Sequence, residues 1–137
     1  MRRTSLKERI VSDRQQLLRV DYESTEHPKK NIQSALVQKT ISTLSKSKAL
    51  IIEDYAKGML TGDMIGKVIS AAKKSGVLTL VDPNSKSSLD MYIGADIITP
   101  NRREAEALVG FKINTDKDLL RAGSLMLEVL GSHFVFI

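Results

Sequence analysis

Cysteine and tryptophan are absent from this chain of 137 residues, and aromatic residues make up only 4% of it. The lack of cysteine excludes disulfide bonds and thiolate metal sites, and it fits a reducing compartment such as the cytoplasm. No apolar run approaches the ~20 residues of a membrane-spanning helix, so no membrane segment is expected. The two histidines, His27 and His133, stand too far apart in the sequence to suggest a zinc site.

Charge of one sign is not concentrated in any block, although the formal net charge is +5. Lysines and arginines in residues 1–30 are interleaved with acidic residues, which is typical of a solvated surface. Since few aromatic side chains are present to stack on bases, nucleic acid is not an expected partner. A small phosphorylated ligand fits scattered basic residues better, because a single phosphate needs only about one to three of them.

The first part of the chain reads as a β-ribbon. Residues 7–23 form two extended segments around a turn at residues 13–16, with partial alternation of apolar and charged side chains. Pro28 then suits the first turn of a helix, and apolar residues follow at helical spacing to about residue 45. We therefore expect a two-stranded sheet that has one wet face or lies over a ligand, followed by an amphipathic helix.

From residue 49 onward, short apolar runs alternate with capped helical segments. The runs cover residues 49–52, 77–81, 97–99 and 134–137, and the helices cover residues 61–75, 101–109 and 115–130. Thr61, Asn101 and Thr115 are the expected N-caps, and a glycine follows each helix as its stop. Apolar strands separated by helices in this way predict an α/β fold with a parallel sheet covered on both faces.

The chain starts on the ribbon and stops on a core strand, without any element to follow it. We therefore expect residues 1–137 to be the central fragment of a larger domain. In this division, residues 4–23 form the ribbon and residues 29–137 form the alternating α/β core.

Polar side chains follow three of the expected strands, and parallel strands would bring all three groups to one edge of the sheet. Asp54 and Lys57 follow the first strand, Asp82 the second, and Asn101 with Glu104 the third. Carboxylates can hold a sugar hydroxyl or a metal, while lysine and the N–H groups of a helix N-terminus can hold phosphate. The two aspartates are also ordinary turn residues, and Asn101 with Glu104 is also a helix-capping box. Their convergence favours an anion and sugar site.

The segments DYAKGMLT (residues 54–61), LVDPN (80–84) and ITPNRREAEALVG (98–110) resemble the ribokinase-like, PfkB-type carbohydrate kinases. The N-terminal TSLKERIVSDRQQLLRVDYE (4–23) is most similar to the heptose-7-phosphate kinase domain of the bifunctional ADP-heptose synthesis enzymes. The resemblance covers nearly the whole chain. It implies a partial three-layer fold, with a mostly parallel sheet flanked by helices and with lid strands from residues 4–23. In this family the lid often makes the contact of a homodimer.

The resemblance also implies a kinase that uses ATP and magnesium. The γ-phosphoryl group would pass to O1 of D-glycero-D-manno-heptose 7-phosphate, on the way to ADP-heptose and the lipopolysaccharide core. By their position in the motif, Asn101 and Glu104 would contact phosphate and the magnesium shell. Lys57 and Arg9 would contact the sugar phosphate or the lid. Asp54 and Asp82 are the other two residues expected to bind the substrate.

Two family elements have no counterpart in the sequence: the N-terminal glycine pair that binds sugar, and the Gly-Ala-Gly-Asp segment that supplies the anion hole and the catalytic base. No Gly-x-Gly-Asp occurs in these 137 residues. No residue is therefore assigned as the general base, and we expect no turnover from this chain alone. Two alternatives stay open: another ribokinase-like sugar kinase, acting for example on ribose or a fructose phosphate, and a non-catalytic truncated remnant.

Overall fold

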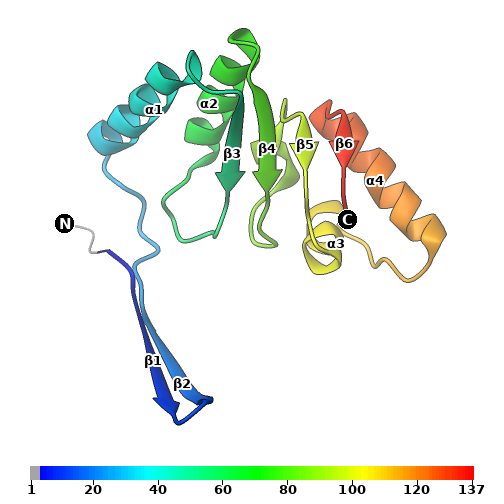
Figure 1. Ribbon diagram of the computed structural model, residues 1–137. Helices are drawn as coiled ribbons and strands as arrows, with labels where there is room; N and C mark the ends of the chain where they lie inside the picture. Colours follow the sequence, from blue (N-terminus) through cyan, green and yellow to red (C-terminus); the bar gives the residue numbers. More distant parts are fainter. Residues whose placement is uncertain (1–3) are drawn as a thin grey trace.

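The computed structural model describes residues 4–137, which form a β-ribbon and an α/β core (Figure 1). The ribbon consists of β1 (Leu6–Ser12) and β2 (Gln15–Tyr22), paired antiparallel. The turn is shorter than the predicted 13–16, because Gln15 and Gln16 pair with the end of β1 and leave only two residues between the strands. Asp13 has φ 50°, in the left-handed region that such two-residue hairpin turns use.

One face of the ribbon is apolar apart from Glu8, which pairs with Val20. The paired positions Leu6 with Tyr22 and Ile10 with Leu18 lie on the same face, since side chains alternate between faces along a strand. All four side chains are about half exposed. The ribbon projects away from the core and makes no extensive contact with its helices or strands within residues 4–137 (Figure 1). This apolar face is therefore uncovered.

The core contains a parallel sheet of four strands in the order β3-β4-β5-β6. The strands are β3 (Ala49–Glu53), β4 (Leu78–Asp82), β5 (Ile97–Ile98) and β6 (Phe134–Val135). All three pairings are parallel, as the apolar runs predicted. The last two strands are shorter than expected, because only their first residues pair with a neighbour.

Helices fill the intervals between the strands. They are α1 (Lys30–Leu44), α2 (Gly62–Lys74), the short 3₁₀-helix η1 (Leu89–Tyr92), α3 (Arg102–Val109) and α4 (Asp116–Leu130). The structure confirms the three N-caps, because the side chains of Thr61, Asn101 and Thr115 each accept a backbone N–H of the first turn. The 3₁₀-helix was not predicted, since its four residues are too few to show a periodic pattern.

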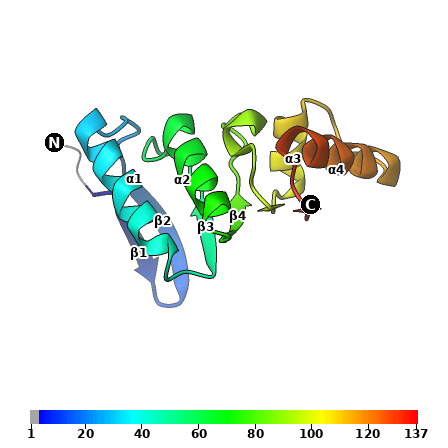
Figure 2. The same cartoon turned by 90° about the horizontal axis from the view of Figure 1, so that it is seen from above.

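The helices cover only one face of the sheet. Strands that follow one another in both sequence and space, with right-handed crossovers, place every connecting helix on the same side, as Figure 2 shows. The covered side buries Ile52, Val81 and Ile98 against α2 and α4. On the other side Ile51 is 66% exposed and Phe134 is 58% exposed. The expectation of a sheet covered on both faces is thus met on one face only within residues 4–137.

Across residues 4–137, no helix combines the length and the apolar character needed to cross a membrane.

Candidate functional site

Three polar loops meet at the carboxyl edge of the sheet, as the sequence predicted. Glu53 and Asp82 end β3 and β4 side by side, and the Asp54 N–H donates to the Asp82 carbonyl oxygen at 2.9 Å. The Thr99 N–H, just past β5, donates to the carbonyl oxygen of Val81 at 3.0 Å. These backbone bonds hold the three strand ends together and form the rim on which the candidate residues lie.

Asp54 is buried beneath this rim, with 8% of its surface exposed. One carboxylate oxygen, Oδ1, accepts the Ala56 N–H at 2.8 Å. The other, Oδ2, accepts the hydroxyl groups of Ser87 at 2.6 Å and of Tyr92 at 2.7 Å. Asp54 therefore fastens the β3–α2 loop to the loop that follows β4. Ser87 and Tyr92 were not predicted, because Ser87 lies before and Tyr92 within a 3₁₀-helix too short to show a periodic pattern.

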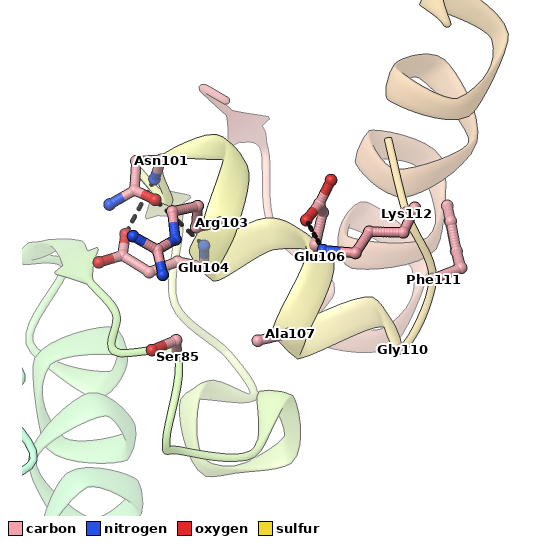
Figure 3. Close-up of a pocket in the computed structure, with 9 residues that line it drawn as sticks. All are labelled: Ser85, Asn101, Arg103, Glu104, Glu106, Ala107, Gly110, Phe111 and Lys112. Atoms are coloured by element: carbon pink, nitrogen blue, oxygen red, sulfur yellow. Dashed lines mark hydrogen bonds and ion pairs between the residues drawn. The ribbon is translucent and has the colours of Figure 1, made fainter. Parts of the chain in front are cut away.

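Asn101 and Glu104 cap each other at the start of α3 (Figure 3). Asn101 Oδ1 accepts the Glu104 N–H at 3.1 Å, and Glu104 Oε2 accepts the Asn101 N–H at 2.9 Å. The capping explanation of these two residues is therefore confirmed. The cap uses one of the two carboxylate oxygens of Glu104 and the single side-chain oxygen of Asn101. A ligand role beside the cap would therefore fall to the second Glu104 oxygen and to the amide nitrogen of Asn101.

Negative charge accumulates where β4 ends. Burial raises the pKa of the Asp82 carboxyl, and the negative charges of Glu104 and Glu53 raise it further. The charges of Glu53, at the end of β3, and of Glu104, in the first turn of α3, thus reach Asp82 across the rim. A bound cation would relieve this repulsion.

The oxygen donors at the rim suit a magnesium ion held in part by the protein. Within residues 4–137, no three His, Cys, Asp or Glu side chains gather closely enough to hold a metal by themselves. Magnesium usually takes one or two carboxylates and completes its shell with water and phosphate oxygens. Glu104, with Asn101 beside it, fits that limited share of the shell.

A cleft of about 760 Å³ lies along α3, directly beside the capped end (Figure 3). It is lined by Ser85, Asn101, Arg103, Glu104, Glu106, Ala107, Gly110, Phe111 and Lys112. Arg103 was not singled out from the sequence, although its position two residues after Asn101 places it in the first turn of the helix. The Lys112 ammonium is 2.7 Å from Glu106 Oε2, and this hydrogen bond lowers the pKa of Glu106.

The two remaining candidates lie closer to the ribbon than to α3. Lys57, in the β3–α2 loop, forms an ion pair with Glu23 at the base of the ribbon. Arg9 lies on β1 opposite Arg19, in the part of the chain that projects away from the rim (Figure 1). The structure therefore brings Asp54, Asp82, Asn101 and Glu104 to one edge, places Lys57 beside them in the loop after Asp54, and leaves Arg9 apart.

Comparison with known protein families covers nearly the whole chain. The pfkB family of carbohydrate kinases matches residues 2–136. The chain belongs to the pfkB family of carbohydrate kinases. This membership agrees with the motifs at the three strand ends, since all three lie within the matched residues.

Relatives of this pfkB-family chain include proteins named bifunctional protein HldE. The one from Gluconobacter oxydans is 33% identical over 130 residues, which is 95% of this chain and 27% of the relative. The one from Helicobacter hepaticus is 38% identical over 122 residues, which is 89% of this chain and 25% of the relative. The chain thus spans about a quarter of the length of the curated relatives that it matches.

Solved structures of ribokinase-like kinases share the fold. The tetrameric inhibited form of phosphofructokinase-2 from Escherichia coli has a TM-score of 0.62 at 17% identity, over 86% of this chain and 40% of that one. Arabidopsis thaliana ribokinase complexed with ribose and ATP has a TM-score of 0.60 at 16% identity, over 90% of this chain and 38% of that one. The sheet and ribbon described above are therefore a part of the pfkB kinase architecture.

Proposed function

We propose that this chain forms the sugar-facing rim and lid ribbon of an ATP- and magnesium-dependent kinase that acts on D-glycero-D-manno-heptose 7-phosphate. The γ-phosphoryl group of ATP would pass to the O1 hydroxyl, and the 1,7-bisphosphate would lead toward ADP-heptose and the lipopolysaccharide core. The reaction would take place in the cytoplasm. In this proposal residues 1–137 form one portion of the kinase domain, and the portion with the general base lies outside them.

The observation that supports this proposal most directly is the combination of the rim with the HldE relatives. The similarity to those relatives runs over 89% to 95% of the chain, and the pfkB family match over residues 2–136 includes both the ribbon and the rim. The rim in turn gathers an amide and three carboxylates at the carboxyl ends of parallel strands, where open α/β sheets bind ligands.

The proposed roles follow from charge and position. Glu104 and Asn101 would hold one side of a magnesium ion and a phosphate group at the start of α3. Bound there, magnesium would neutralise phosphate oxygens as the phosphoryl group moves. Lys57 would neutralise the sugar phosphate, and Asp82 would accept a sugar hydroxyl. Asp54 would act by holding the loop of Lys57 in place, since both of its oxygens are occupied by protein donors.

The proposed binding site can be tested on the chain as it is, by following its amide NMR signals. Addition of heptose 7-phosphate is expected to shift the signals of residues 54–58 and 82–84, and magnesium with ATP is expected to shift those of residues 101–104. Glu104→Gln keeps an oxygen for the cap but removes the charge, so it is expected to weaken the magnesium-dependent shifts. Asp118→Asn makes the same change in the capping box of α4 and serves as the matched control. Shifts confined to other surfaces, or equal loss in both variants, would refute the proposed site.

The sugar is tested against its nearest competitor. Another sugar kinase is favoured by the likeness of the fold to phosphofructokinase-2, so fructose 6-phosphate and ribose are titrated beside the heptose. Tighter binding of either sugar would reassign the substrate. No ADP is expected to form from the chain alone, and ADP production with heptose 7-phosphate would contradict that part of the proposal.

The proposed homodimer uses the apolar face of the ribbon. Leu18 is 52% exposed on that face and is paired with Ile10, so Leu18→Lys would place a charge in the contact. Val11 is 62% exposed and follows Ile10 directly on β1, which places it on the opposite face, so Val11→Lys is the matched control. Sedimentation is expected to show a dimer for the wild type and Val11→Lys and a monomer for Leu18→Lys. A wild-type monomer would contradict the dimer without affecting the proposed sugar site.

A further inference from the structure

Across residues 4–137, the contacts described between the ribbon and the core lie at the base of the ribbon. Neither β1 nor β2 packs extensively on a helix or strand of the core within residues 4–137, and Figure 1 shows both strands extending away from it. The direction in which the ribbon projects must therefore be set where the chain leaves β2. At that point residues 23–27 run beside residues 57–58 of the β3–α2 loop.

Backbone meets backbone at Gly58. This glycine has φ +73°, and a Cβ atom added to it would lie 1.9 Å from the carbonyl oxygen of Thr25 and 2.6 Å from the carbonyl carbon. Real side chains do not approach so closely, so only glycine permits the contact. The loop and the ribbon base are consequently packed without any side chain between them.

Two polar contacts flank this close approach. His27 Nδ1 donates a hydrogen bond to the Gly58 carbonyl oxygen at 2.8 Å. Lys57 forms an ion pair with Glu23, whose side chain is only 13% exposed, and partial burial makes such a pair stronger than one in open solvent. The ribbon base is therefore bound to the loop on both sides of Gly58. We call these five residues, Glu23, Thr25, His27, Lys57 and Gly58, the ribbon joint.

The same loop is fastened at its other end by Asp54. Asp54 precedes Gly58 by four residues, and its carboxylate accepts hydrogen bonds from the hydroxyl groups of Ser87 and Tyr92. We propose that the ribbon joint, anchored to the core through Asp54, holds the ribbon at a fixed angle to the core, with Gly58 and Glu23 as the positioning residues. The position of the ribbon is thereby coupled to that of Lys57. The relevance of this coupling to a sugar phosphate rests on the proposed function, but the coupling itself does not.

A distance measurement across the joint tests the proposal. The chain has no native cysteine, so Arg14→Cys in the ribbon turn and Ser70→Cys on α2 give two unique sites for spin labels. Electron–electron resonance is expected to give one narrow distance distribution in this background. Gly58→Ala forces Thr25 away and is expected to broaden the distribution and shift its maximum. Gly76→Ala is the matched control, because Gly76 also has positive φ, at +65°, but a Cβ there would meet nothing within 4 Å.

Each result decides the question. An unchanged distribution in Gly58→Ala, or an equal change in Gly76→Ala, would overturn the proposal. If circular dichroism shows that Gly58→Ala does not fold, Glu23→Gln is measured instead, since it removes the charge that pairs with Lys57 and leaves the backbone contact intact. That variant is expected to broaden the distribution, and an unchanged width would overturn the proposal. Because no ligand is added, failure here is distinct from failure of the proposed sugar site.

Discussion

The Tyr92 hydroxyl donates a 2.7 Å hydrogen bond to Asp54 Oδ2, and this bond joins two loops 38 residues apart in the sequence. Tyr92 has no exposed surface. Its ring fills the core beneath the rim while its oxygen fixes a carboxylate at the end of β3. The position of the loop that carries Lys57 thus depends on a side chain buried in the core.

The buried phenol of Tyr92 is expected to titrate late. Burial raises the pKa of Tyr92 to about 12, and the hydrogen bond to Asp54 adds to the effect. Because the pKa of Tyr92 is raised in the folded state, the protonated phenol contributes fully to the free energy of unfolding below the unfolded pKa of ~10. This contribution to stability is lost as pH rises through about 12. Absorbance at the phenolate band should show a late step that Tyr92→Phe removes. Tyr22→Phe is the control, and loss of the late step in that variant would contradict the assignment.

The two capping boxes provide a matched pair for separating stability from binding. Asn101→Ala and Thr115→Ala each remove an N-cap, so both are expected to lower the free energy of unfolding by about 1 kcal/mol. Only Asn101→Ala is expected to weaken the binding of magnesium with ATP. Urea unfolding and calorimetric titration measure the two effects. Equal binding by both variants would show that Asn101 acts solely as a cap.

Magnesium is expected to lower the pKa of Asp82. Without a cation, burial and the nearby charges of Glu104 and Glu53 hold this pKa above its usual range. A divalent ion at Glu104 would favour the charged form of the neighbouring carboxyl and reverse the shift. Carboxyl ¹³C NMR over a pH series, with and without magnesium, measures the change. Asp96, which precedes β5 at the opposite end of the sheet, should keep its pKa, and a parallel change there would indicate a non-specific salt effect.

Asp96 is expected to contribute to acid sensitivity. Burial alone would raise its pKa, but hydrogen bonds from the Thr79 N–H and hydroxyl, with His133 nearby, outweigh this and lower it. Because the pKa of Asp96 is lowered in the folded state, its carboxylate contributes fully to the free energy of unfolding above the unfolded pKa of ~3.9. This contribution to stability is lost as pH falls below the unfolded pKa toward the lower pKa of the folded state. Urea unfolding measures how much free energy of unfolding is lost between about pH 5 and about pH 3. This loss should be smaller in Asp96→Asn than in the wild type. An identical loss would contradict the assignment.

The elements that could be predicted from the sequence are those with local signals. Each capping box, at Asn101 and at Thr115, is defined by residues within a four-residue stretch of sequence, and both are present in the structure. The strand ends that carry Asp54 and Asp82 were likewise predictable, because an apolar run ends in a turn residue. Parallel pairing then brings them to one edge.

The contacts that sequence reasoning missed join distant segments. Nothing near Asp54 indicates Tyr92, and nothing near Gly58 indicates that Thr25 lies against it. The uncovered face of the sheet was missed for a different reason. In the run that contains Ile51 and Ile52, both residues are equally apolar, yet one is exposed and the other buried. A continuous apolar run indicates a strand but not how many of its faces are covered.

The strands of the sheet lie in space in the order in which they occur in the sequence. Within residues 4–137, β4, β5 and β6 therefore each pair with the strand synthesised immediately before them. Contacts between sequence neighbours form faster than those that close long loops, and polypeptides begin to fold from the N-terminal side during synthesis. We expect β3 to serve as the template for β4, β4 for β5 and β5 for β6 as the growing chain leaves the ribosome.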